Sequence, residues 1–401
     1  DEEQKDADRQ ENTDRKESDE EQKDADQPEN TDRQENAGQQ PQPQQAAPAD
    51  AAPAAPAPAN GFCKNIITVI NNAATALKLT LKDVKIDVSD TGKNTGYPWT
   101  SDEGKAALSV QGNGNVEIEL DGNNELKSGP HRAGLEKNTS TSTGTLTLKD
   151  DNNEAGSLTA TGGDWGAGIG NGGYYGNSDN RSGENITITG GTVNATGGWG
   201  GAGIGGGYYG SGKNITIKGG TVTATGGEEG AGIGGGGGGG NGAGGNGKNI
   251  TIIGGTVTAG GGYRGAGIGG GISGSGKNIT ITGGTVNADG GTNAAGIGGG
   301  ATGSGSNVTV SGAAQVTAIA GKSNGYYGAG ATIGNGGDFT GSENVDGKEI
   351  QADISRVTTG YIHHIIYDPA LVSEDNPLGI VREWWEPERP QPNPEDPNAP
   401  A

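Results

Sequence analysis

The chain has 401 residues, of which 84 are glycine, 29% are hydrophobic and only 4% are aromatic. This composition is too poor in apolar residues for several thick globular cores, and the glycines do not follow a collagen-like triplet period. Because the sequence has no run of about 18 apolar residues, we predict no membrane insertion. The net charge of −22 argues against nucleic acid as a partner, because a negative surface repels phosphate.

The two ends of the chain have nothing to bury. Residues 1–36 are two copies of one acidic unit, with 16 acidic and 6 basic side chains (net charge −10) and no leucine, isoleucine, valine or aromatic residue. We expect this repeat to be disordered, the Pro-, Ala- and Gln-rich residues 37–61 to be an extended spacer, and residues 387–401 to be a similar Pro-rich tail. Because the chain starts at Asp1 without methionine or a signal peptide, we expect a mature secreted chain or an excised fragment.

Period-two alternation of apolar residues begins soon after the spacer. LKLTLKDVKIDV from Leu77, NVEIELDG from Asn115 and TLTL from Thr145 each predict short strands with one apolar face. The single cysteine, Cys63, rules out an internal disulfide, and we interpret it as an inert thiol. The stability of the chain must therefore come from packing.

The middle of the chain carries a strict repeat. NITI recurs at Asn185, Asn214, Asn249 and Asn278, and as NVTV at Asn307, at intervals of 29, 35, 29 and 29 residues. The six extra residues of the long interval fall in a glycine tract, which we interpret as a loop insertion. A second marker, AGIG or ATIG, recurs in step with the first and places Ile169, Ile204, Ile233, Ile268, Ile297 and Ile333. A register of this kind is typical of solenoids and not of linkers.

Each unit resolves into three short strands separated by glycine corners. In the unit from Asn278 the strands are NITI, TVNA and AAGIG, and period-two alternation sends one set of side chains inward. The inward set is Ile279, Ile281, Val286, Ala288, Ala295 and Ile297, and the outward set is Thr280, Thr285 and Asn287. Three strands that close in 29 residues predict one coil of an all-β, right-handed parallel β-helix, the hand following the general rule for parallel crossovers. We expect about eight coils, with the first asparagines stacked as an internal or corner ladder.

The predicted β-helix spans residues 62–340. The open ends of such a stack invite edge pairing and need covers. We expect FCKNIITVINNAA from Phe62 to cover the first end, and the segment from Phe339 to Val372 to cover the second. Residues 341–386 are accordingly predicted to be C-terminal cap strands.

The units NITITGGTVNATGGWGGAGIGGG and VEIELDGNNELKSG resemble the β-helix regions of large secreted or wall-attached proteins of Gram-positive gut bacteria, which are carbohydrate-binding or adhesin-like. The resemblance covers roughly residues 64–340. It implies an extracellular, secreted or cell-wall-associated protein whose partners are glycans or host or cell-surface proteins.

β-Helices also carry polysaccharide lyases and hydrolases, which need paired acids on one face or calcium with a basic residue. Between residues 185 and 310 the only acids inside the coils are Glu228, Glu229 and Asp289, all at or beside corners. Adjacent residues point apart in a strand, so we interpret Glu228–Glu229 as a solvated turn. We predict no catalytic residue and no enzymatic activity.

The sequence predicts no metal site and no cofactor, with calcium at residues 149–156 as the alternative left open. KDDNNEAG at residues 149–156 offers oxygen ligands for calcium but lacks a fixed ligand spacing. His363 and His364 face opposite sides of a predicted strand, so we interpret them as cap residues, and His131 is isolated. The N-x-T matches coincide with the strand period and are better explained by the asparagine ladder.

Aromatic residues gather in the variable turn before each GAGIG and after the GIG strand. The candidate ligand contacts are Trp165, Trp199, Tyr263, Arg264, Tyr326, Tyr327, Tyr174, Tyr175, Tyr208 and Tyr209. Flat amphipathic rings on a rigid edge suit stacking on a sugar or contact with a protein. The alternative is that these rings only cover the glycine backbone locally.

A threonine array forms a second surface pattern. Its first rank is Thr192, Thr221, Thr256 and Thr285, and its second is Asn194, Thr223, Thr258 and Asn287. Such an array can organise water, as in ice-binding β-solenoids, but threonine is also favoured at outward strand positions. We predict a non-enzymatic surface protein for adhesion or carbohydrate binding through the aromatic edge, with an ice-binding protein, a pectin-lyase-like enzyme and a structural spacer as the alternatives.

Overall fold

The computed structural model describes residues 61–93, 102–137, 143–152, 154–173, 182–238, 244–377 and 379–387. The expectations for the acidic repeat, the spacer and the Pro-rich tail fall on residues 1–60 and 388–401 and lie outside this part. The described residues belong to one compact unit, Pro56–Ala401. They form strands and one short 3-10 helix, η3 (Pro369–Leu371), and none of them lies in a helix long and apolar enough to cross a membrane.

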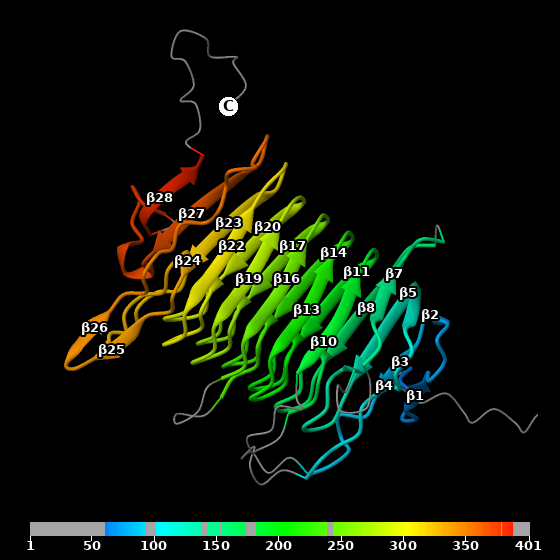
Figure 1. Cartoon of the computed structure of the whole chain (residues 1–401). Coiled ribbons are helices and arrows are strands. Elements are labelled where there is room, and N and C mark those ends of the chain that lie inside the picture. Colours follow the sequence, from blue (N-terminus) through cyan, green and yellow to red (C-terminus); the bar gives the residue numbers. More distant parts are fainter. Residues whose placement is uncertain are drawn as a thin grey trace, which may run out of the picture. The chain divides into compact units, whose positions relative to one another are not determined.

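The described unit is a parallel β-helix in which each coil contributes one strand to each of three rows (Figure 1). One complete coil contains β19 (Gly276–Ile281), β20 (Thr285–Asp289) and β21 (Ile297–Gly298). Each strand pairs in parallel with its equivalent in the next coil, as in Ile279 with Val308 and Val286 with Val316. The prediction of three strands per coil is confirmed.

The first and second rows carry the longer strands. The first row consists of β2 (Leu77–Lys82), the first half of β5 (Val116–Lys127), β7 (Leu146–Lys149), β10 (Gly183–Ile188), β13 (Gly212–Ile217), β16 (Gly247–Ile252), β19 and β22 (Gly305–Val310). The second row consists of β3 (Lys85–Asp87), the second half of β5, β8 (Gly156–Thr161), β11 (Thr192–Thr196), β14 (Thr221–Thr225), β17 (Thr256–Gly260), β20, β23 (Gln315–Ala320) and β27 (Tyr361–Tyr367). The described first row has eight strands, in agreement with the expected coil number.

The third row is built from strands of two to four residues. It consists of β1 (Ile67–Ile70), β4 (Leu108–Gln111), β6 (Leu135–Lys137), β9 (Ile169–Gly170), β12 (Ile204–Gly205), β15 (Ile233–Gly234), β18 (Ile268–Gly269), β21 and β24 (Ile333–Gly334). The glycine of each IG pair is required by the backbone. Gly234 has φ of +140°, and a Cβ added to it would collide with the carbonyl oxygen of Gly269 in the next coil.

The core is a stack of small aliphatic side chains inside the coils. All six residues predicted to point inward in the unit from Asn278 are at most 1% exposed. Equivalent residues lie in register from coil to coil, as Ile215, Ile250 and Ile279 do. Because each coil covers its neighbours, no coil is expected to be stable alone.

The predicted asparagine ladder is confirmed and runs along the corner where the first-row strands begin. Asn214, Asn249, Asn278 and Asn307 each donate Nδ2–H to Oδ1 of the preceding asparagine, at 3.0 to 3.1 Å. These asparagines, with Asn185, have φ between +53° and +58°, a left-handed conformation that asparagine tolerates better than most residues. The ladder therefore stabilises the corner.

Different devices close the two ends of the stack. At the first end Cys63 bridges to Ile86 and β1 pairs with β4, so the segment after Phe62 lies along the second and third rows. In the first row β2 pairs only with β5 among the described strands. Its edge carries Lys78 and Lys82, charged residues that discourage edge-to-edge pairing.

The other end is covered by the C-terminal segment (Figure 1). β27 pairs with β23, and β28 (Ile380–Glu386) adds an antiparallel strand to β27. In the first row, Asp353 forms a parallel bridge to Thr309 of β22 and so covers the last strand of that row. The hairpin of β25 (Asp338–Thr340) and β26 (Glu343–Val345) projects from this end.

Truncating one stacked isoleucine tests the core. Ile250 is fully buried between Ile215 and Ile279, so Ile250→Ala should lower the free energy of unfolding by about 2–5 kcal/mol. Thr256→Ala, at an exposed outward position of β17, should change it by about 0.5 kcal/mol or less. Chemical denaturation followed by circular dichroism measures both, and equal effects would contradict the stacked core.

Candidate functional site

The variable turns that precede the third-row strands form a continuous turn edge. They are residues 129–132, 163–166, 198–201, 227–230, 262–265 and 291–294. In each, the N–H of the last residue donates to the carbonyl of the first, over 2.8 to 3.2 Å. A longer last turn is closed by the N–H of Gly330, which donates to the carbonyl of Gly321 at 2.8 Å. The coil period thus presents these turns in a fixed order.

The loops that follow the third-row strands are tied to this turn edge. The N–H of Tyr208 donates to the carbonyl of Trp165, and that of Ile272 donates to the carbonyl of Glu229, both at 2.8 Å. In each case the loop of one coil bonds to the turn of the coil before it. The turn edge and these loops therefore form one surface.

The expectation that Trp165 and Tyr208 are exposed ligand contacts is wrong. Trp165 is 0% and Tyr208 is 4% exposed. Their rings stack with centroids 5.0 Å apart, and the His131 ring lies 4.8 Å from that of Trp165. The physical reason is the glycine around them: Gly200 leaves the space that the Tyr208 ring fills. For these two rings, the alternative that they cover glycine backbone is correct.

Trp199 and Tyr209 are half-buried beside this stack. Trp199 donates its Nε1–H to Oε2 of Glu228 in the next turn at 2.8 Å, which fixes the plane of the indole. Tyr174 and Tyr175 lie outside the described residues. The N-terminal half of the turn edge therefore keeps one partly accessible indole, that of Trp199, which is held by the Glu228 carboxylate.

The C-terminal half of the turn edge carries the exposed rings. Tyr263 is 45% and Tyr326 is 62% exposed. The guanidinium carbon of Arg264 lies 5.4 Å from the ring centroids of both Tyr263 and Tyr327, and Tyr326 stacks on Phe339 at 5.0 Å. Phe339 was missed as a candidate contact, although it is an isolated aromatic just after the last repeat marker, ATIG at residues 331–334. These side chains form a mixed aromatic and cationic platform.

The first turn of the turn edge, residues 129–132, was also missed when the variable turns were identified from the sequence. Arg132 forms ion pairs with Glu103 at 2.6 Å and with the buried Glu136. Burial raises the pKa of Glu136 and lowers the pKa of Lys137 to about 8. The signal was the AGLEK stretch, which aligns with AGIGG and so places PHR in the variable turn.

Glu228 and Glu229 occupy a turn, as predicted, but only Glu228 is solvated. Glu229 is half-buried. The pKa of its carboxyl is raised to about 7, mainly by burial; the nearby Arg264 opposes this shift and Glu228 adds to it. A carboxyl group with such a pKa can both donate and accept hydrogen bonds near neutral pH.

The outward threonines lie in register on the second row. Thr192, Thr221, Thr256 and Thr285 are exposed and pair in sequence along β11, β14, β17 and β20. The first row holds a further rank, of which the sequence analysis named only Thr280 as an outward residue. This rank is Thr147, Thr187, Thr216, Thr251, Thr280 and Thr309. The threonine array is therefore regular, with the two asparagines interrupting only its second rank.

The acidic turn at residues 149–156 is held together by its own side chains. Lys149 Nζ lies 3.0 Å from Asp151 Oδ1 and 3.2 Å from Glu119 Oε2, and the other oxygen of Glu119 accepts from the N–H of Asp151 at 2.8 Å. Within the described ranges, no three His, Cys, Asp or Glu side chains are grouped so that they could hold a metal ion.

His363 and His364 lie on β27 and point to opposite sides, as predicted. His363 stacks on Trp385 with centroids 4.2 Å apart, and His364 stacks on Trp384 at 4.4 Å. Both tryptophans come from β28. The two histidines therefore fasten the cap hairpin.

His364 also anchors the cap to the last coil. Its Nδ1 lies 2.6 Å from Thr332 Oγ1, which in turn lies 3.0 Å from both carboxylate oxygens of Glu349. Burial lowers the pKa of the imidazole to about 4. The ring is consequently neutral at physiological pH.

Comparison with known proteins supports the fold. Four segments, residues 186–208, 215–245, 250–272 and 279–301, match the family model described as Beta helix repeat. No curated protein and no solved structure matches the chain. Together with the three stacked rows, the matches identify a β-helix protein, a class that includes enzymes and non-enzymes.

Replacing Glu229 tests its environment. Its folded pKa of about 7 exceeds the ordinary value of 4.5, so at pH 8 the folded chain holds a carboxylate charge that burial disfavours. We expect Glu229→Gln to raise the free energy of unfolding by about 1 kcal/mol at pH 8, after allowance for partial exposure, and to have no such effect below pH 4.5. Urea denaturation at both pH values measures this. The exposed Glu343→Gln should show no gain, and an equal gain at both pH values would contradict burial as the cause.

Replacing His364 tests the cap. The folded pKa of about 4 lies below the ordinary 6.5, so the unfolded chain binds more protons between these values and stability falls as the pH falls through this window. Between pH 7.5 and pH 4 the free energy of unfolding should fall by up to about 3 kcal/mol less in His364→Gln than in the unmodified chain. Hydrogen exchange of β27 and β28 measures it, with His363→Gln as the control. An unchanged pH dependence in His364→Gln would refute the assignment.

Proposed function

We propose that the protein is a non-enzymatic, extracellular β-helix surface protein that binds carbohydrate through the partly exposed rings of its turn edge. The observation that carries the proposal is the spacing of these rings. Trp199, Tyr263 and Tyr326 come from turns of every second coil. Since neighbouring coils are about 4.8 Å apart, Trp199 and Tyr263 are separated by about 10 Å along the axis. Two linked pyranose rings have a comparable length.

The turns between these rings supply hydrogen-bonding groups. Glu228 and Glu229 lie between Trp199 and Tyr263, and the half-buried Thr292 follows Tyr263 in the next turn. An extended glycan along the axis would meet rings and polar groups alternately. This is the combination that sugar recognition needs, because a pyranose has an apolar face and a rim of hydroxyls.

The rings are also held in place before any ligand arrives. Glu228 fixes Trp199, Arg264 contacts Tyr263, and Phe339 supports Tyr326. Side chains fixed in this way lose little conformational entropy on binding. The same rigidity would also suit contact with a cell-surface protein, so the ligand class is decided by experiment.

Alanine substitution of the three rings tests the proposal. In a glycan-binding screen, Trp199→Ala, Tyr263→Ala and Tyr326→Ala should each weaken the affinity for the best glycan about fivefold, because one stacked ring contributes about 1 kcal/mol. Trp199→Phe, which keeps a ring but loses the bond to Glu228, should weaken it less. Thr256→Ala, on the second row, is the matched control and should bind normally.

The alternatives give different results in the same series. If the variant that carries all three alanine substitutions keeps its affinity for the glycan, the turn edge is not the binding site. If the unmodified chain binds no glycan, the protein is better explained as a structural spacer. Degradation of polygalacturonate would overturn the non-enzymatic part of the proposal. Thermal hysteresis in cooled solution would assign the function to the threonine array.

A further inference from the structure

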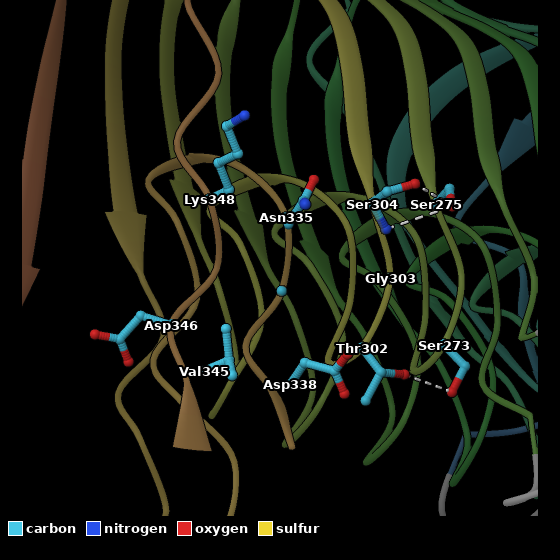
Figure 2. Close-up of a pocket in the computed structure, with 11 residues that line it drawn as sticks. Ser273, Ser275, Thr302, Gly303, Ser304, Asn335, Asp338, Val345, Asp346 and Lys348 are labelled. Carbon is cyan, nitrogen blue, oxygen red and sulfur yellow. Dashed lines mark hydrogen bonds between the residues drawn. The ribbon is translucent and has the colours of Figure 1, made fainter. Parts of the chain in front are cut away.

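A polar cavity of about 280 Å³ lies where the β25–β26 hairpin meets the last coils. Its lining includes Ser273, Ser275, Thr302, Ser304, Asp338 and Lys348. The serines and the threonine come from loops after third-row strands, and the other side comes from the hairpin and the segment that leaves it (Figure 2). The cavity thus brings together loops of two neighbouring coils and the hairpin that follows the last coil.

One wall of the cavity is a double rank of hydroxyls. Ser273 Oγ lies 3.0 Å from Thr302 Oγ1, and Ser275 Oγ lies 3.0 Å from Ser304 Oγ (Figure 2). Each pair joins equivalent positions of adjacent coils, so the coil repeat fixes its geometry. A paired hydroxyl can still accept or donate another hydrogen bond.

The opposite wall adds charged groups. One carboxylate oxygen of Asp338 accepts from the N–H of Phe339 at 2.7 Å, and one of Asp346 accepts from the N–H of Ala329 at 2.8 Å. In the part of the chain that the structure describes, the second oxygen of each carboxylate and the ammonium of Lys348 have no protein partner. Asp338 therefore offers a carboxylate acceptor on this wall, and Figure 2 shows the side chains of Asp346 and Lys348 pointing away from the hydroxyls, at the margin of the cavity.

We propose that this cavity is a second glycan site, separate from the turn edge, that holds one neutral pyranose unit. The proposal rests on the proposed function only for the class of ligand. The volume lies at the lower end of ligand pockets, near 300 Å³, and it suits one sugar ring. Neighbouring hydroxyls of a sugar donate to a carboxylate and both donate to and accept from hydroxyls, and this cavity presents a carboxylate in Asp338 and hydroxyls in the double rank.

The charges decide which sugars fit. Two carboxylates and one ammonium give the lining a net charge of −1, and the chain carries −22. A uronate or another acidic sugar would meet this field with a like charge, which weakens binding and slows encounter. A bare cation would share the cavity with Lys348, whose ammonium opposes it. A neutral, hydroxyl-rich sugar ring is repelled neither by the negative field nor by the Lys348 ammonium.

Monosaccharide titration of the full chain tests the site. The probes are a panel of neutral hexoses and N-acetylhexosamines, one uronic acid and calcium alone, followed by ligand-observed NMR and calorimetry. At least one neutral sugar should bind, with Kd raised tenfold or more by Asp338→Asn and by Thr302→Val, which keeps the shape of the side chain. Glu343→Gln, on β26 of the same hairpin but outside the cavity lining, should bind normally. Circular dichroism and the melting temperature confirm that each variant is folded.

The result also separates this site from the turn edge. Thr302→Val should leave the affinity of the turn edge for its best glycan unchanged, because Thr302 lines the cavity and not the turn edge. If neutral sugars bind but Asp338→Asn and Thr302→Val have no effect, the cavity proposal fails while carbohydrate binding by the turn edge can still stand. Preference for the uronic acid, or binding of calcium without any sugar, would overturn the assignment.

Discussion

The close approach of successive coils is the constraint on which the rest of the structure depends. In the third row, Gly170, Gly205, Gly234, Gly269 and Gly298 all have φ between +136° and +145°, and a Cβ on any of them would collide with the carbonyl oxygen of the equivalent glycine in the next coil. Parallel ladders fix the coil spacing at about 4.8 Å. Only residues without a side chain allow the backbone to turn at this spacing, so the glycine content is a packing requirement.

The same constraint determines where function can reside. Inward positions must be aliphatic, and from β9 to β24 every third-row strand is an isoleucine–glycine pair, so neither can vary between these coils without loss of packing. The turns before the third row are held by backbone hydrogen bonds, which any residue except proline can make whatever its side chain. They can therefore carry tryptophan in one coil, paired glutamates in the next and tyrosine with arginine after that. A rigid scaffold with variable turns is a common basis for binding surfaces.

The sequence predicted the periodic part of the molecule because every coil repeats the same local environment. Ile279, Val286 and the asparagine ladder required only the 29-residue interval and period-two alternation. The burial of Trp165 could not be predicted in this way, because its cover is Tyr208 of the next coil, and the relation between the two depends on how a loop folds back. The pKa of Glu229 and the cavity beside Asp338 likewise depend on contacts between non-equivalent positions. A repeat gives information about equivalent positions only.

The electrostatics of the site differ from what the net charge suggests. Glu229 is partly protonated at neutral pH, because burial raises its pKa to about 7, and Arg264 next to it lies against two tyrosine rings. The centre of the turn edge is therefore much less negative than a turn with two glutamates implies. A carboxyl group in this state can donate to one sugar hydroxyl and accept from another. The turn edge and the cavity thus converge on the same ligand chemistry, since both present mixed donors and acceptors with little net charge, on a chain whose overall field disfavours anions.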